Sequence, residues 1–121
     1  MSEANYQIVR DALRGVATEN RDVSNDFSRY DFTFAAKTGT AEVAGKQDFA
    51  WFACYAPYED PRFALALCIE EGGSGGAVAS PVAARVMKAA IDYSNGVTID
   101  YEKISVGTPG KTQQAGGESN E

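Results

Sequence analysis

Three apolar stretches separated by short turn-forming linkers constrain the fold of this chain more than any other feature. They cover residues 32–43, 49–56 and 62–70, and in each of them apolar side chains recur at every second position. This period of two is typical of β-strands. The linkers at residues 44–46 and 57–61 are short enough to form hairpins, so the sequence predicts an antiparallel meander.

The side chains of the second and third stretches predict how the sheet is covered. In the second stretch, Trp51 and Tyr55 fall on one face and Phe52 falls on the other, so both faces are expected to be buried. In the third stretch, Leu65 and other large residues share one face, while Ala64 and other small residues share the opposite face. A face of small residues predicts a helix packed closely against it.

Two segments have the spacing of amphipathic helices. The first covers residues 3–16, and its apolar face consists of Tyr6, Val9, Leu13 and Val16. The second begins at Ser80-Pro81, where serine can cap a helix and proline suits its first turn. Asn95-Gly96 is expected to end it.

The remaining segments are expected to be less regular. Residues 18–31 are polar and predict a loop, residues 97–106 are a weaker strand candidate, and residues 107–121 predict a disordered tail. The sequence therefore predicts a mixed α+β domain over residues 1–106. It consists of an antiparallel sheet of at least three strands, with the N- and C-terminal helices packed on it.

Composition excludes several classes of function. The chain has 121 residues, a net charge of −6 and no histidine. An acidic chain is unsuited to nucleic acid, whose recognition needs a basic face. Without histidine, the chain cannot form a Ser-His-Asp or Cys-His catalytic site by itself. No pattern of residues indicates a metal site or a cofactor, and none is expected.

The two cysteines are expected to be free thiols. The hairpin after residue 56 pairs Ala56 near Phe63, which places Cys54 opposite Leu65 and leaves Cys68 opposite another residue. Cys68 then faces Trp51. Two cysteines that are not opposite each other on paired strands cannot form a bridge without a change of register.

The sharpest candidate for a binding site is Lys37-Thr38-Gly39-Thr40, on the first predicted strand. An ammonium group attracts a carboxylate, hydroxyl groups donate hydrogen bonds to it, and a glycine lets a ligand lie against the backbone. The alternative is an ordinary strand in which the threonines are simply good β-formers.

Five short signatures follow one another in the order of a known family. They lie at residues 34–42, 50–57, 60–62, 71–76 and 79–83. Their order and spacing resemble the end of the transpeptidase domain of class B penicillin-binding proteins, especially the elongation type called penicillin-binding protein 2. The resemblance extends from Tyr6 to Tyr93 and implies part of a β-lactamase/transpeptidase-like fold.

The resemblance implies a role for each residue of the candidate site. Lys37 contacts the serine elements and the carboxylate side of the ligand, and the hydroxyl groups of Thr38 and Thr40 bind the carboxylate. Gly39 lets the ligand approach the strand. The backbone N–H of Thr40 forms half of the oxyanion hole. The implied reaction is D,D-transpeptidation of peptidoglycan stem peptides, with β-lactams acylating the same serine, in a protein anchored on the extracytoplasmic side of the cell membrane.

The chain departs from this family in lacking the nucleophile. None of its serines is followed by lysine three residues later or by asparagine two residues later. In the family both elements lie N-terminal to the Lys-Thr-Gly strand, so the chain is expected to be a C-terminal piece that is inactive alone. The strand at residues 62–70 then loses a neighbour, and its unpaired apolar edge predicts self-association. The alternative is that residues 97–106 fold back and cover this edge within the same chain.

Two other classes of function remain open from the sequence. One is a fragment of a β-lactamase or β-lactam sensor, whose strand carries the same triplet. The signature at residues 51–57 and the turn at residues 72–76 favour the synthase over this class. The other is a non-catalytic binding or assembly module, in which the triplet is a coincidence.

Overall fold

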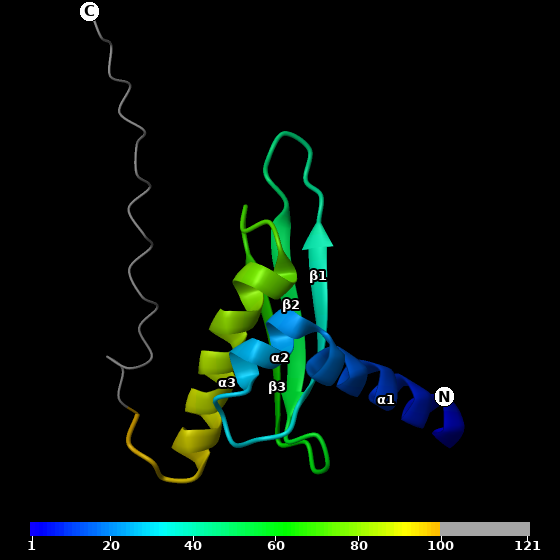
Figure 1. Ribbon diagram of the computed structural model, residues 1–121, viewed down its shortest axis with the longest axis vertical. Coiled ribbons are helices and arrows are strands. Elements are labelled where there is room, and N and C mark those ends of the chain that lie inside the picture. Colours follow the sequence, from blue (N-terminus) through cyan, green and yellow to red (C-terminus); the bar gives the residue numbers. More distant parts are fainter. Residues whose placement is uncertain (100–121) are drawn as a thin grey trace, which may run out of the picture.

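The computed structural model describes residues 1–99 and contains one sheet with helices packed against it (Figure 1). Its mixed α+β class and its antiparallel meander of three strands, in the order β1-β2-β3, confirm the prediction from sequence. The predicted 97–106 strand and 107–121 tail lie outside the described residues, except for residues 97–99, which form no strand. The elements are α1 (Glu3–Glu19), α2 (Arg21–Phe27), β1 (Ala35–Ala41), β2 (Phe49–Ala56), β3 (Phe63–Ile69), the π-helical turn η1 (Gly75–Ala79) and α3 (Ser80–Ser94).

The register of the second hairpin agrees with the sequence prediction. Ala56 pairs with Phe63, Cys54 lies opposite Leu65, and Cys68 therefore lies across from Trp51. Both cysteines are free thiols. Burial raises the pKa of the Cys54 thiol to about 12, so this side chain stays protonated at neutral pH.

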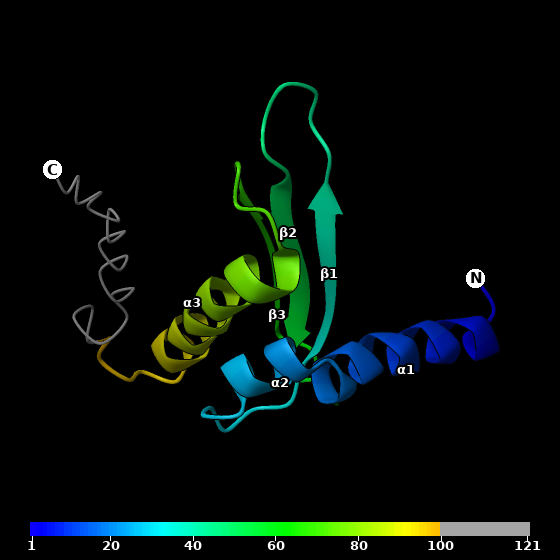
Figure 2. The same ribbon diagram turned by 45° about the horizontal axis from the view of Figure 1, so that its top comes forward.

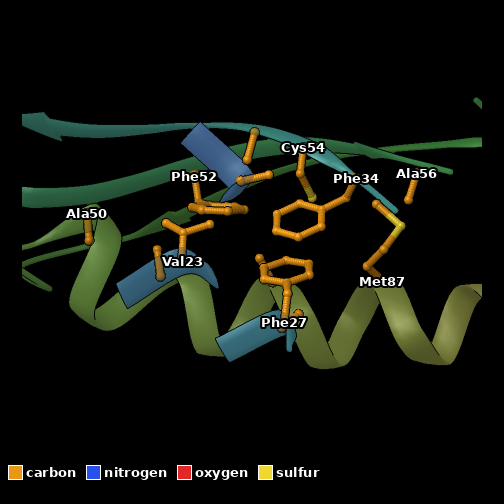
Figure 3. Packing of buried hydrophobic residues seen from close by; sticks show 13 residues of the cluster. Val23, Phe27, Phe34, Ala50, Phe52, Cys54, Ala56 and Met87 are labelled. Carbon is orange, nitrogen blue, oxygen red and sulfur yellow. The ribbon is translucent and has the colours of Figure 1, made fainter. Parts of the chain in front are cut away.

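One face of the sheet, here called the covered face, packs against α3 and the turn η1, and Phe27 of α2 joins the same core. The side chain of Phe52 on β2 is 1% exposed and points into this core. Phe27 of α2 stacks on Phe34 at 3.8 Å between ring centroids, and Phe52 lies beside both rings (Figure 3). Small buried residues of α3, Ala83 and Ala84, let the helix approach the strands closely.

The opposite face, here called the uncovered face, carries Trp51, Ala53 and Tyr55 of β2 and the small residues of β3. Trp51 is 44% exposed, and Ala53 is also exposed. The expectation that both faces are buried is therefore wrong for this chain, because no element of residues 1–99 packs over the middle of this face. The expectation of a helix against the small residues of the third strand is wrong for the same reason, since α3 packs against the face with the large residues. A groove of about 430 Å³ remains there, and Leu13 of α1 lines one side of it.

Residues 18–31 were expected to form a loop, but α1 continues to Glu19 and α2 follows almost at once. Asn20 ends α1 and also caps α2, because its side-chain oxygen accepts a hydrogen bond from the N–H of Val23 at 3.3 Å. Val23 and Phe27 are one helical turn apart, and both are buried. Anchoring of this apolar pair in the core outweighs the polar composition of the segment.

The start of α3 differs from the prediction as well. Ser80 does not cap the helix: it is fully buried, and its hydroxyl has no hydrogen-bond partner among the described residues. The preceding turn η1 is capped instead by Ser74, whose hydroxyl accepts from the N–H of Ala77 at 3.2 Å. The helical segment therefore begins five residues earlier than expected, in the glycine-rich turn.

Helix α1 is anchored to the sheet at one end only. Arg14 donates to the carbonyl of Phe34 at 2.7 Å, and Arg10 donates to the carbonyl of Tyr58 at 2.5 Å. The Tyr58 hydroxyl donates to Asp11 at 3.0 Å, and this bond raises the pKa of Tyr58. The N-terminal half of α1 projects past the edge of the sheet next to β1 (Figures 1 and 2), so the predicted apolar face is covered only in part.

Candidate functional site

The four residues predicted to form the site all lie on β1. Within residues 1–99, β1 pairs only with β2, so its other side is an open edge of the sheet. An open edge presents backbone N–H and C=O groups that have no partner in a neighbouring strand. The candidate site is therefore a strand edge rather than a closed cavity.

The side chains alternate between the two faces of the sheet, as they must on a β-strand. Lys37 and Gly39 share the uncovered face with Trp51, whereas Thr38 and Thr40 lie toward the covered face. Lys37 and Thr40 are exposed, and Thr38 is half-buried. The ammonium group and the two hydroxyl groups thus approach the open edge from opposite sides of the strand.

A hydrogen bond shows where the backbone of this strand points. The Lys37 ammonium donates to the carbonyl of Thr38 at 2.6 Å. We infer that the Thr38 carbonyl faces the open edge, because the Lys37 side chain is exposed and reaches it there. Backbone groups two residues apart on an antiparallel strand face the same side, so the N–H of Thr40 faces this edge too.

The structure adds a residue that the sequence analysis did not include in the site. Gly75, in the turn η1, lies directly beneath the Gly39–Trp51 pair on the covered face. From the sequence, the glycine-rich turn at residues 72–76 served only as a signature of the family. No periodic pattern in the sequence reveals that two distant glycines meet, although the run of glycines at residues 72–76 indicates a close approach of backbones.

Other kinds of site have no support in the structure. No group of three or more His, Cys, Asp or Glu side chains within residues 1–99 is arranged to hold a metal ion. The carboxylate of Glu59, in the loop after β2, has a lowered pKa because it accepts a hydrogen bond from the hydroxyl of Thr33. This bond ties the loop after β2 to the segment that precedes β1.

Comparison with known sequences finds one family. Residues 1–88 match the family described as the penicillin binding protein transpeptidase domain. The chain is 34% identical over 76 residues to the peptidoglycan D,D-transpeptidase MrdA of Haemophilus influenzae, a match that covers 50% of this chain and 12% of that protein. The chain thus spans only a small part of this curated relative.

Comparison with solved structures agrees with the sequence match. Pseudomonas aeruginosa PBP2 in complex with WCK 5153 has a TM-score of 0.68 and 31% identity, covering 83% of this chain and 22% of that one. The D,D-transpeptidase domain of a peptidoglycan glycosyltransferase from Eggerthella lenta has a TM-score of 0.60 and 34% identity, covering 74% and 20%. Both similarities extend over most of the present chain and a minor part of the solved one.

Proposed function

Because this chain belongs to the penicillin-binding protein transpeptidase domain family and forms part of such a domain, we propose that it supplies the substrate-binding strand of a peptidoglycan D,D-transpeptidase. The observation that carries this proposal is the placement of Lys37, Thr38 and Thr40 around one open strand edge. The relatives named as D,D-transpeptidases favour this function over a β-lactamase or a non-catalytic module.

Each group on the edge of β1 suits one part of the ligand. The Lys37 ammonium attracts the carboxylate of a stem peptide or a β-lactam, and the hydroxyl groups of Thr38 and Thr40 donate hydrogen bonds to it. An extended peptide that lies along the edge also pairs with the free backbone groups of the strand. Gly39, between them, leaves room for the ligand to approach the backbone.

In the proposed reaction, a serine from outside this chain attacks the peptide carbonyl before the terminal D-alanine. Its hydroxyl proton passes to the amine of the departing D-alanine as the peptide bond breaks, and an acyl-enzyme forms. The amine of a second stem peptide then attacks the acyl group and loses a proton, which returns to the serine oxygen as the new peptide bond forms and the serine is released. The N–H of Thr40 faces the open edge, where it can donate to the negative charge that develops on the carbonyl oxygen.

The isolated chain is expected to form no covalent adduct with a fluorescent penicillin, because it has no serine followed by lysine three residues later. The intact mass after incubation measures this directly. A complete transpeptidase, treated in the same way, is the positive control for the reagent. A stoichiometric adduct on this chain would contradict the assignment of the nucleophile to another segment.

We further propose that the parent protein acts on the extracytoplasmic face of the cell membrane, where peptidoglycan is crosslinked, and contributes to cell shape. The family match and the D,D-transpeptidase relatives support this location. Among residues 1–99, no helix is both long enough and apolar enough to cross a bilayer.

Self-association of the isolated chain is also proposed. In the described part of the fold, β3 is the second open edge of the sheet, and Ala66 and Trp51 lie exposed on the uncovered face beside it. Pairing of two such edges around a two-fold axis would satisfy their backbone groups. Light scattering at micromolar concentration is expected to give the mass of a dimer.

Two variants separate association through this surface from unspecific aggregation. Ala66→Lys places a charge on the exposed side of β3 and is expected to yield a monomer. Val86→Lys adds the same charge at an exposed position of α3 and should leave the dimer intact. A monomeric unmodified chain would count against the proposal.

A further inference from the structure

The Lys37–Thr40 strand is supported from behind by a backbone contact that only glycine permits. Gly75 is buried in the turn η1, against the covered face of the sheet. A side-chain carbon added at Gly75 would overlap the carbonyl oxygens of Gly39 and Trp51. It would also lie 2.9 Å from the amide nitrogen of Gly39. These three atoms are the backbone of one cross-strand pair in the sheet.

The atoms in contact with Gly75 cannot turn aside as the end of a flexible side chain would. They belong to the β1–β2 ladder, so they move only if the strands themselves move. A side-chain carbon added at Gly39 would lie only 3.1 Å from the Cβ of Trp51, its partner in the ladder. Gly75 therefore closes off the pair on the covered face, whereas the pair can move toward the uncovered face, where Trp51 is exposed.

The turn that holds Gly75 is itself fixed and cannot easily move back. The N–H of Gly73 donates to the carbonyl of Asp48 at 2.7 Å, and the N–H of Gly72 donates to that of Ile69 at 3.2 Å. These bonds tie the turn to the ends of β2 and β3. On its other side the turn continues into α3, whose first turns are buried through Ser80 and Ala83.

We propose that Gly75 is a positioning residue, which sets the distance between the Lys37–Thr40 strand and the elements packed on the covered face. Any larger residue would push the Gly39–Trp51 pair outward. Thr38 and Thr40 flank Gly39, so their hydroxyl groups and the Thr40 N–H would move with it. This inference rests on the proposed function for its meaning, because the displaced groups are those assigned to ligand binding.

Gly76 provides a matched control in the same turn. A side-chain carbon there would lie 3.9 Å from the Cγ2 atom of Thr38 and 4.0 Å from a carboxylate oxygen of Asp22, which are ordinary van der Waals distances. Its backbone does not adopt the left-handed region, unlike that of Gly73. Gly76→Ala therefore adds the same methyl group next to the site strand without the overlap.

The experiment compares Gly75→Ala and Gly76→Ala by NMR of the isolated chain, which requires no ligand and no catalytic activity. Gly75→Ala is expected to shift the backbone amide signals of Thr38, Gly39 and Thr40 and the indole signal of Trp51, the one tryptophan of the sequence. It should also lower hydrogen-exchange protection at Gly39 by roughly 10- to 100-fold, the scale of an overpacked contact. Gly76→Ala should leave these signals nearly unchanged.

A purely structural role would give a different result. Met87→Ala removes a fully buried core side chain of α3 and lowers stability from another place in the fold. If Gly75→Ala resembled Met87→Ala, with lower stability but unmoved signals on β1, the positioning role would be wrong. If the two alanine variants of the turn behaved alike, it would also be wrong.

A second measurement covers the case in which Gly75→Ala does not fold. In the unmodified chain, the amides of Gly39 and of the turn at residues 75–79 should open with the same free energy, because β1 cannot loosen while the turn stays in place. Rapid exchange at Gly39 beside a protected turn would overturn the proposal. Neither measurement depends on carboxylate binding, so failure of the proposed function would leave their outcome unaffected.

Discussion

Replacing Lys37 by alanine is expected to slow β-lactam acylation by at least about 100-fold in a complete transpeptidase that contains this chain, the scale for removing a donor that acts in the transition state. The Lys37 side chain is exposed and donates a hydrogen bond to the neighbouring carbonyl of Thr38. Its loss therefore removes a positive charge from the strand edge without opening a cavity. The second-order rate of labelling by a fluorescent penicillin measures the effect.

Lys46→Ala is the matched control for this experiment. Lys46 is also exposed, lies in the loop between β1 and β2, and its removal changes the net charge by the same amount. We expect the acylation rate of this variant to stay close to that of the unmodified protein, and the melting temperatures of both variants to be unchanged. An acylation rate for Lys37→Ala within a few-fold of the unmodified rate would show that the ammonium group takes no part.

Replacing Phe27 by alanine is expected to lower the free energy of unfolding by about 3–5 kcal/mol, the usual cost of truncating a buried phenylalanine. The ring is 3% exposed, stacks on Phe34 and meets Phe32 edge to face at 6.0 Å. Since a small domain is stable by only about 5–15 kcal/mol, this single change should bring the chain close to unfolding. The midpoint of urea unfolding measures it.

Asn25→Ala serves as the comparison, because Asn25 is exposed on the same short helix and does not cap it. Alanine is a good helix former, so this variant should unfold at nearly the same urea concentration as the unmodified chain. Equal midpoints for the two variants would contradict the view that α2 is held by its apolar face.

The sheet could be predicted from the sequence because the residues that determine it are close together in the chain. Alternating side chains mark the three strands, and the short linker at residues 57–61 fixes the pairing of Cys54 with Leu65 and of Trp51 with Cys68. The candidate site could be found for the same reason, since Lys37-Thr38-Gly39-Thr40 is contiguous. In the structure, the side chains of the triplet alternate between the faces of β1.

The errors arise where distant parts of the chain decide the local structure. Residues 21–27 look polar, and only the burial of Val23 and Phe27 beneath the sheet makes them a helix. Serine is a typical residue at a helix N-cap, but the chain is already helical at Gly75, before it reaches Ser80. The alternation of large residues on β2 predicts two buried faces, although no element of residues 1–99 packs over the centre of the face that carries Trp51.

The two hairpins on either side of β2 also determine on which face of β1 each side chain of the candidate site lies. Because β1, β2 and β3 follow one another directly, the alignment of β1 depends on the length of the loop at residues 42–48. A slip of one residue would exchange the two faces. Lys37 would then point into the aromatic core, and Thr38 would face solvent on the other side. Insertions in this loop that leave the pairing of β1 with β2 unchanged should therefore be tolerated. A single residue inserted within β1 would instead exchange the faces on which the ammonium and hydroxyl groups lie.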